Sequence, residues 1–138
     1  MLTFLKGVKV LFTSPVTLPA ATTTDIRPFL TAVQPLQTEN LGFVSIQLEV
    51  TGVGAAAAGD IEIELGKSLL NGLDDTQAED LTMRIALNGT ATERRSFVLD
   101  VRGVLSIILL NAINEDPAVN ATLQMRIYAD VLSGAGGL

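Results

Sequence analysis

The sequence predicts an all-β protein, specifically an antiparallel, jelly-roll-like β-sandwich of about eight strands. Two observations favour this class. Apolar and polar residues alternate with a period of two in a series of short segments, while a helical period of 3.6 is hard to find. Turn residues separate these segments and no helical crossover lies between them, so antiparallel pairing in a sandwich is expected.

Five segments alternate clearly, with apolar side chains directed to one face and polar side chains to the other. In chain order they are residues 44–50, 60–65, 81–87, 97–101 and 123–131. Residues 8–12 and 26–33 are predicted as strands from weaker patterns. Pro28 donates no ladder hydrogen bond, which favours an edge position or an irregular extended piece for the second of these. Residues 104–110 complete the set as a strand that does not alternate.

The chain of 138 residues is long enough for one domain with a substantial core. We expect a single β-sandwich domain over residues 1–132, followed by a flexible Gly-rich tail at 133–138. Residues 1–40 are rich in Pro and Thr and are expected to include an extended arm or loop. Such a segment either crosses over within its own chain, the simpler expectation, or wraps a neighbouring subunit. Residues 68–80 are the one helix candidate.

The composition excludes several kinds of chemistry. The chain has no Cys and no His, which removes thiolate catalysis, the usual Ser-His-Asp triads and the commonest transition-metal ligands. The net charge of −6 argues against a nucleic-acid partner. No apolar stretch approaches the roughly 20 residues of a membrane helix. We therefore expect no enzyme activity, no cofactor and no membrane association.

Acidic side chains leave two alternatives open. Residues 74–80 form the densest carboxylate group, for which a calcium site is conceivable, but the EF-hand spacing is absent and a solvated loop is expected. A hydrolase that uses carboxylates alone is the second alternative. Most acidic residues, such as Glu49, occupy outward positions of amphipathic strands, and the chain has no Trp on which a sugar ring could stack. We therefore expect neither a metal site nor a catalytic site.

The apolar segment 104–110 carries large aliphatic side chains on both faces, so its second face must also be covered. The Pro/Thr-rich arm of the same chain is one possible cover, and a second copy of the chain is the other. The second possibility predicts a homo-oligomer, with a trimer favoured. The candidate interface residues are Leu105, Ile108, Leu110, Val98 and Leu11.

The order of the segments also resembles a known class. An extended Thr-rich start leads to strands like residues 42–52 and 59–66, then to the block 97–109 and a closing strand at 121–130. Over residues 1–132 this pattern resembles small β-sandwich accessory proteins of tailed-phage virions, of the capsid decoration (cement) or head-fibre type.

The resemblance implies a non-enzymatic, homo-oligomeric protein on the outer surface of a capsid, where it stabilises the phage head. Its partners would be other copies of itself and a capsid or other virion protein. The alternative function is a carbohydrate- or ligand-binding β-sandwich module, which could belong to a phage tail or fibre.

Overall fold

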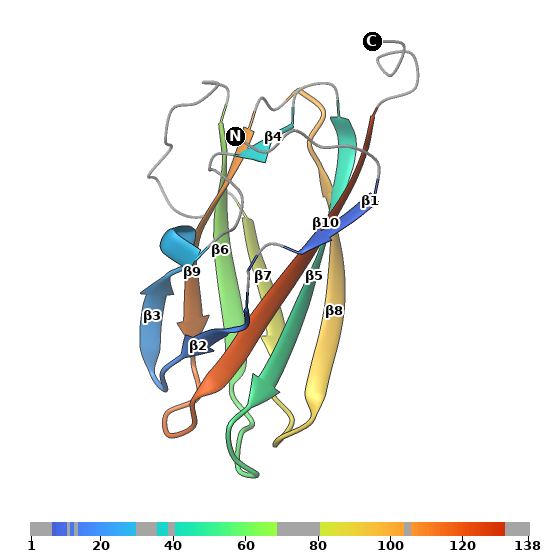
Figure 1. Cartoon of the computed structure of the whole chain (residues 1–138). Helices are drawn as coiled ribbons and strands as arrows, with labels where there is room; N and C mark the ends of the chain where they lie inside the picture. The colour runs from blue at the N-terminus through green and yellow to red at the C-terminus, as the bar shows by residue number, and fades with distance from the viewer. Residues whose placement is uncertain are drawn as a thin grey trace.

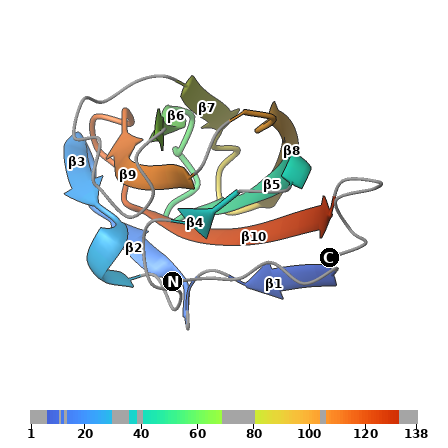
Figure 2. The ribbon, with the colours of Figure 1, turned by 90° about the horizontal axis from the view of Figure 1, so that it is seen from above.

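Two antiparallel β-sheets pack face to face in the computed structural model, which describes residues 7–10, 12, 14–29, 36–38, 41–68, 81–103 and 106–131 (Figures 1 and 2). The first, called the β5 sheet, contains β1 (Gly7–Val10), β2 (Val16–Leu18), β5 (Leu41–Gly52), β8 (Thr92–Asp100) and β10 (Ala121–Val131). The second, called the β9 sheet, contains β3 (Thr22–Asp25), β4 (Leu36–Gln37), β6 (Asp60–Ser68), β7 (Leu81–Ala86) and β9 (Ser106–Asn114). A short 3-10 helix, η1 (Arg27–Phe29), follows β3.

The strand order is that of a jelly roll. The β5 sheet runs β1, β10, β5, β8, with β2 also paired to β10, and the β9 sheet runs β3, β9, β6, β7, with β4 also paired to β9. When β1 and β2 share one position and β3 and β4 share another, the eight positions form two Greek keys, and the chain changes sheet at every step except the hairpin from β6 to β7. The predicted fold class is thus confirmed.

The described parts of the segment 1–40 belong to the edges of the chain's own sheets. Both β1 and β2 lie against β10, where Val8 is opposite Tyr128 and Val16 is opposite Leu123. On the β9 sheet, β3 and β4 line the same edge of β9 one after the other. These parts therefore fit the crossover within the chain rather than an arm extended to a neighbour.

The predicted strand over residues 26–33 is wrong in its described part. The strand comes earlier, as β3, and the chain then turns through η1, where the Phe29 N–H donates to the Ile26 carbonyl. Pro28 lies inside this turn, which needs no N–H from it. Residues 30–33, the helix candidate beyond Ser68 and the tail 133–138 lie outside the described residues.

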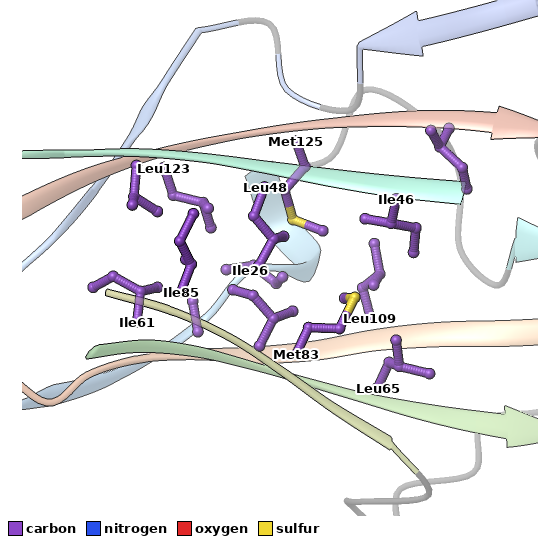
Figure 3. Packing of buried hydrophobic residues seen from close by; sticks show 14 of the residues in the cluster. Ile26, Ile46, Leu48, Ile61, Leu65, Met83, Ile85, Leu109, Leu123 and Met125 are labelled. Carbon is purple, nitrogen blue, oxygen red and sulfur yellow. The ribbon is translucent and has the colours of Figure 1, made fainter. Parts of the chain in front are cut away.

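Inward-facing side chains of the alternating strands fill the space between the sheets (Figure 3). From the β5 sheet, Leu48 and Met125 point toward the β9 sheet, whose Ile61 and Met83 point back toward them. Ile26, just before η1, enters the same interior. Each of these side chains is almost completely removed from water, so the hydrophobic effect holds the two sheets together.

Strand β9 is buried on both faces. Ile107 and Leu109 belong to the core between the sheets, whereas Ile108 and Leu110 face away from it and are still only 0% and 5% exposed. The register against β6 shifts between Glu64 and Leu65, which leaves Leu110 as the extra residue of a β-bulge. The second apolar face predicted for this segment is therefore covered within a single chain.

Candidate interaction surface

The outer face of the β5 sheet presents the polar side chains of three neighbouring strands. Outward residues of β5 lie opposite outward residues of β8 on one side and of β10 on the other. Ser45 is opposite Val98 and Tyr128 in this way. In the next row along the strands, Gln47 is opposite Ser96 of β8 and Arg126 of β10. Successive side chains of a strand point to opposite faces of the sheet, so the alternation that buries the apolar residues also places the polar residues on this outer face.

Two large apolar side chains are exposed on this face. Phe43 is 50% exposed and Val98 is 68% exposed. They are diagonal neighbours, because Phe43 is opposite Asp100 while Ser45, one repeat further along β5, is opposite Val98. The Arg102 guanidinium lies over the Phe43 ring at 5.2 Å from its centroid. We call these two residues the Phe43–Val98 patch, and exposed apolar surface of this kind is typical of contact sites.

Charged residues of alternating sign lie on the same face. The Glu49 carboxylate accepts hydrogen bonds from Arg94 at 2.9 Å and from Arg126 at 2.7 Å. Burial raises the pKa of Glu49, but the hydrogen bonds from Arg126 and Arg94 outweigh it and hold this pKa below its ordinary value. Just beyond the end of β8, Arg102 donates to both oxygens of Asp100, at 2.9 and 2.6 Å. These pairs keep the charged side chains in place on the face.

A shallow hollow of about 270 Å³ lies among these side chains. It is lined by Ser45, Gln47, Ser96, Arg126, Ile127 and Tyr128. The hollow thus has serine hydroxyl groups, the Gln47 amide and the Arg126 guanidinium beside the aromatic ring of Tyr128. Such a set of groups can hydrogen-bond a small polar ligand.

The loops after β5 and β9 are joined by one buried carboxylate at the lower end of the sandwich in Figure 1. Asp116, only 3% exposed, accepts hydrogen bonds from the backbone N–H groups of Ala58, Gly59, Ala118 and Val119, at 2.9 to 3.0 Å. These N–H donors hold the pKa of Asp116 well below its ordinary range, although desolvation acts in the opposite direction. A Cβ on Gly59 would lie 2.5 Å from the Asp116 Cα, so the two loops approach too closely for a larger residue.

On the outer face of the β9 sheet, Arg84 is surrounded by three carboxylates. Its guanidinium contacts Glu62 at 2.9 Å, Glu115 at 3.1 Å and Asp60 at 3.4 Å. The arginine side chain is half exposed, so each ion pair is screened by water. Arg84 nevertheless separates acidic groups that would otherwise repel one another.

We expect Arg84→Ala to lower the free energy of unfolding by about 1 kcal/mol or less at low ionic strength, because it removes the cation and leaves three facing carboxylates. Salt screens that repulsion, so the loss should shrink in high salt. Urea unfolding at low and high salt measures both effects. Arg102→Ala is the control, since Arg102 contacts the single carboxylate of Asp100 among the described residues. A loss for Arg84→Ala that is the same at both salt concentrations would contradict this explanation.

The structure separates the residues of the predicted interface. Val98 is exposed on the outer face of the β5 sheet, whereas Ile108 and Leu110 belong to the β9 sheet and are buried in the chain itself. Leu105 and Leu11 lie outside the described residues, as does the acidic stretch 74–80. Ile108 and Leu110 thus have almost no surface for a second copy to contact, and the predicted interface reduces to Val98 among the described positions.

Three features of these surfaces were missing from the sequence prediction. Phe43 was assigned to a strand but not to the contact surface. It directly precedes the alternating run that starts with the inward Val44, so the alternation itself indicates that Phe43 points outward. Asp116 precedes Pro117 in a predicted turn, and the Asp-Pro pair is a known signal for a side chain that hydrogen-bonds nearby N–H groups. The ion pairs of Arg84 depend on cross-strand register, for which single-sequence patterns carry little signal.

Within the described ranges, no cluster of three or more Asp, Glu, His or Cys side chains has a geometry that could hold a metal ion. The same part of the chain contains no helix that is long and apolar enough to span a membrane.

The chain is similar to known proteins in structure but not in sequence. No protein family model matches the chain, and no curated protein matches it. The chain is similar to a chain in the cryo-EM atomic structure of Broad Bean Stain Virus, with 19% sequence identity and a TM-score of 0.41. The match covers 65% of this chain and 55% of that one, so it spans about half the length of the viral chain.

Proposed function

We propose that this chain is a non-enzymatic structural protein of a virion, and specifically a homo-oligomeric capsid decoration (cement) protein that stabilises a phage head from its outer surface. The observation that carries the proposal is the strand order, in which two Greek keys are divided between the two sheets. Jelly rolls with this order form viral capsid domains and lectin domains. A ligand-binding module is thus the competing function that the same fold allows.

The surfaces of the molecule support a role in assembly. The Phe43–Val98 patch lies on a regular sheet, where β5 is held by ladders on both sides and β8 by its ladder to β5, so contact there costs little ordering entropy. The loops at one end of the sandwich are held in place by the hydrogen bonds of Asp116. A rigid scaffold with exposed apolar residues suits binding to a capsid protein or to other copies of the chain, and a trimer is the stoichiometry favoured by the sequence analysis.

The proposal is tested on particles from the cells that make this protein. Density-gradient fractions are analysed by quantitative mass spectrometry, and an antibody against the recombinant chain locates it by immunogold microscopy. We expect the chain at a fixed ratio to the main capsid protein, with gold on the outside of intact heads. Recovery of the chain only in the soluble fractions would overturn the proposal.

The Phe43–Val98 patch gives a prediction for the same particles. Recombinant Phe43→Ser/Val98→Ser protein should rebind to particles depleted of the chain at least about tenfold more weakly than the unaltered protein, because its apolar contact is lost. Phe29→Ser is the matched control, since Phe29 is similarly exposed but lies on η1, away from this face. Equal rebinding by the double variant and the unaltered protein would remove the patch from the proposal.

The hollow beside Tyr128 favours a ligand-binding module as the second candidate function. In that case, a glycan array or calorimetry with neutral saccharides would give a signal that Tyr128→Ala abolishes and Tyr128→Phe largely keeps, since the ring and not its hydroxyl supplies the stacking surface. An array without any signal, together with the chain on particles, would leave the virion role as the better explanation.

A further inference from the structure

The last strand of the β5 sheet, β8, has one unpaired edge in the described part of the chain, where β5 is its only partner. The Val101 N–H donates to the Gly42 carbonyl, so the backbone groups of the odd-numbered residues of β8 point toward β5. Those of Arg94, Ser96 and Val98 therefore point away from the sheet. Their side chains are also exposed. Together they form an edge on which another strand can pair.

The neighbouring edge of the β9 sheet differs. There, Arg95 of β8 reaches across the side of the sandwich and donates to the Arg84 carbonyl of β7 at 3.1 Å. The same guanidinium lies 4.8 Å from the centroid of the Phe97 ring. The middle of the β7 edge is thus capped by a side chain, which is a common protection against edge pairing. Ser96 and Val98 on β8 have no such cap among the hydrogen bonds of the described residues.

We propose that β8 pairs antiparallel with β8 of a second copy about a two-fold axis at Phe97, so that two β5 sheets become one continuous sheet. This inference rests on the self-association included in the proposed function. We choose a second copy as the partner because, when two β8 strands run antiparallel, the positive charge of one lies opposite the negative charge of the other.

The register follows from the positions of these charges. Pairing about Phe97 places Arg94 opposite the partner's Asp100 and Ser96 opposite the partner's Val98, and the symmetry repeats both pairs. All of these residues have backbone groups that point to the open edge, as hydrogen-bonded pairs require. An axis at Ser96 would instead set Arg94 against the partner's Val98. An axis at Val98 would set Arg94 against the partner's Arg102, with like charges facing.

The proposed contact extends the charge pattern already present on the outer face. In one chain the charges form a slanting row, Arg126, Glu49, Arg94, in which Arg94 is directly opposite Glu49, Arg126 is diagonal to it, and each charge is opposite in sign to the next. The partner's Asp100 and the partner's Arg102 would continue this row across the axis. Opposite charges directly across two strands stabilise a sheet, and like charges destabilise it. Val98, the most exposed large apolar residue among those described, would also gain a neighbour in this contact.

The first test blocks the edge with proline. Val98→Pro removes an N–H that makes no hydrogen bond to β5, so the chain should still fold, while the ladder between copies loses a donor. Val98→Thr keeps the N–H and is the matched control. By sedimentation velocity at micromolar concentrations, the unaltered protein and Val98→Thr should form even-numbered species, while Val98→Pro should dissociate. A thermal melt confirms that each variant is folded.

The second test exchanges the charges. Arg94→Asp or Asp100→Arg alone should weaken self-association about tenfold or more, because each variant places like charges opposite one another twice. The Arg94→Asp/Asp100→Arg double variant should restore association. Within a single chain the double variant only adds repulsion, since the new Asp faces Glu49 and the new Arg faces Arg102. Rescue can therefore arise only between copies.

Two results would overturn the inference. One is an unaltered protein that stays monomeric throughout, and the other is an oligomer of any size that neither Val98→Pro nor the single charge exchanges weaken. A trimeric unit formed through another surface is compatible with this contact only in assemblies with an even number of chains, of which a hexamer joined edge to edge is the smallest. These measurements are independent of the particle experiment. A chain that is found on particles but whose self-association the edge variants do not weaken would reject only the β8 contact, and a β8 dimer absent from particles would reject only the virion role.

Discussion

Asp116→Asn is expected to lower the melting temperature by roughly 10 °C at neutral pH, because it disrupts the contact that joins two loops. One carboxylate oxygen accepts from Ala58 and Gly59, and the other accepts from Ala118 and Val119. In either orientation, the amide group of asparagine would set an N–H₂ donor against two backbone donors. Differential scanning calorimetry measures the loss.

The same substitution should change how stability depends on pH. The pKa of Asp116 in the folded chain lies well below its ordinary value, so the folded state favours the ionised form. Its contribution to stability is complete above the unfolded pKa and is lost as the pH falls through the folded pKa. The melting temperatures of the unaltered protein and Asp116→Asn should therefore converge between about pH 5 and about pH 2.

Asp25→Asn is the control for both measurements. The pKa of Asp25 is also lowered, mainly by its hydrogen bond from Arg27, but both side chains are well exposed and the pair is screened. We expect a change in melting temperature of no more than about 2 to 4 °C for this variant. If the melting temperatures of Asp116→Asn and the unaltered protein fell in parallel with falling pH, this would contradict the role given to the Asp116 carboxylate.

The central strands could be predicted from the sequence because each one separates a buried face from an exposed one. The predicted segments 44–50 and 60–65 form the middle of β5 and the first part of β6. Their ends were less certain, since β5 extends to Leu41 and Gly52, where the alternation is weaker. The period of two depends on burial alone, so it locates the middle of a strand better than its ends.

The edges of the sheets were harder to predict for a physical reason. The position opposite β10 is filled by two short strands, and η1 interrupts the corresponding position beside β9. Each of these strands has only two to four residues, which is too short to show a period of two clearly, whereas the longer edge strands β7 and β8 alternate clearly. The role of Asp116 was missed for a different reason, because acidic residues in turns are usually solvated and two of the four N–H groups that it binds come from a loop 57 and 58 positions away.

The interface prediction failed at Ile108 and Leu110 because a single sequence does not show which parts of the chain pack against each other. The apolar run 104–110 correctly indicates two covered faces, but not which part of the structure covers the second. In the folded chain Ile108 lies buried on the β9 sheet, and Val98 lies exposed on the opposite sheet. The outward position of Val98, unlike the burial of Ile108, follows directly from the alternation with Phe97 and Leu99.

Truncation of these two residues should therefore have very different effects. Ile108→Ala is expected to lower the free energy of unfolding by about 2 to 4 kcal/mol, because the side chain is 0% exposed and its removal leaves a cavity. Val98→Ala, at a position that is 68% exposed, should change it by no more than about 0.5 kcal/mol in the monomer. Urea unfolding at low protein concentration, where association does not contribute, measures both.

The comparison decides which surface is available for assembly. If Ile108 is buried in each chain, Ile108→Ala shifts the urea midpoint at every protein concentration, whereas Val98→Ala has its effect only where copies associate. An Ile108→Ala loss that appears only at high concentration would mean that a second copy covers Ile108. In that case the contact surface would lie on the β9 sheet, as the apolar run first suggested, and not at the edge of β8.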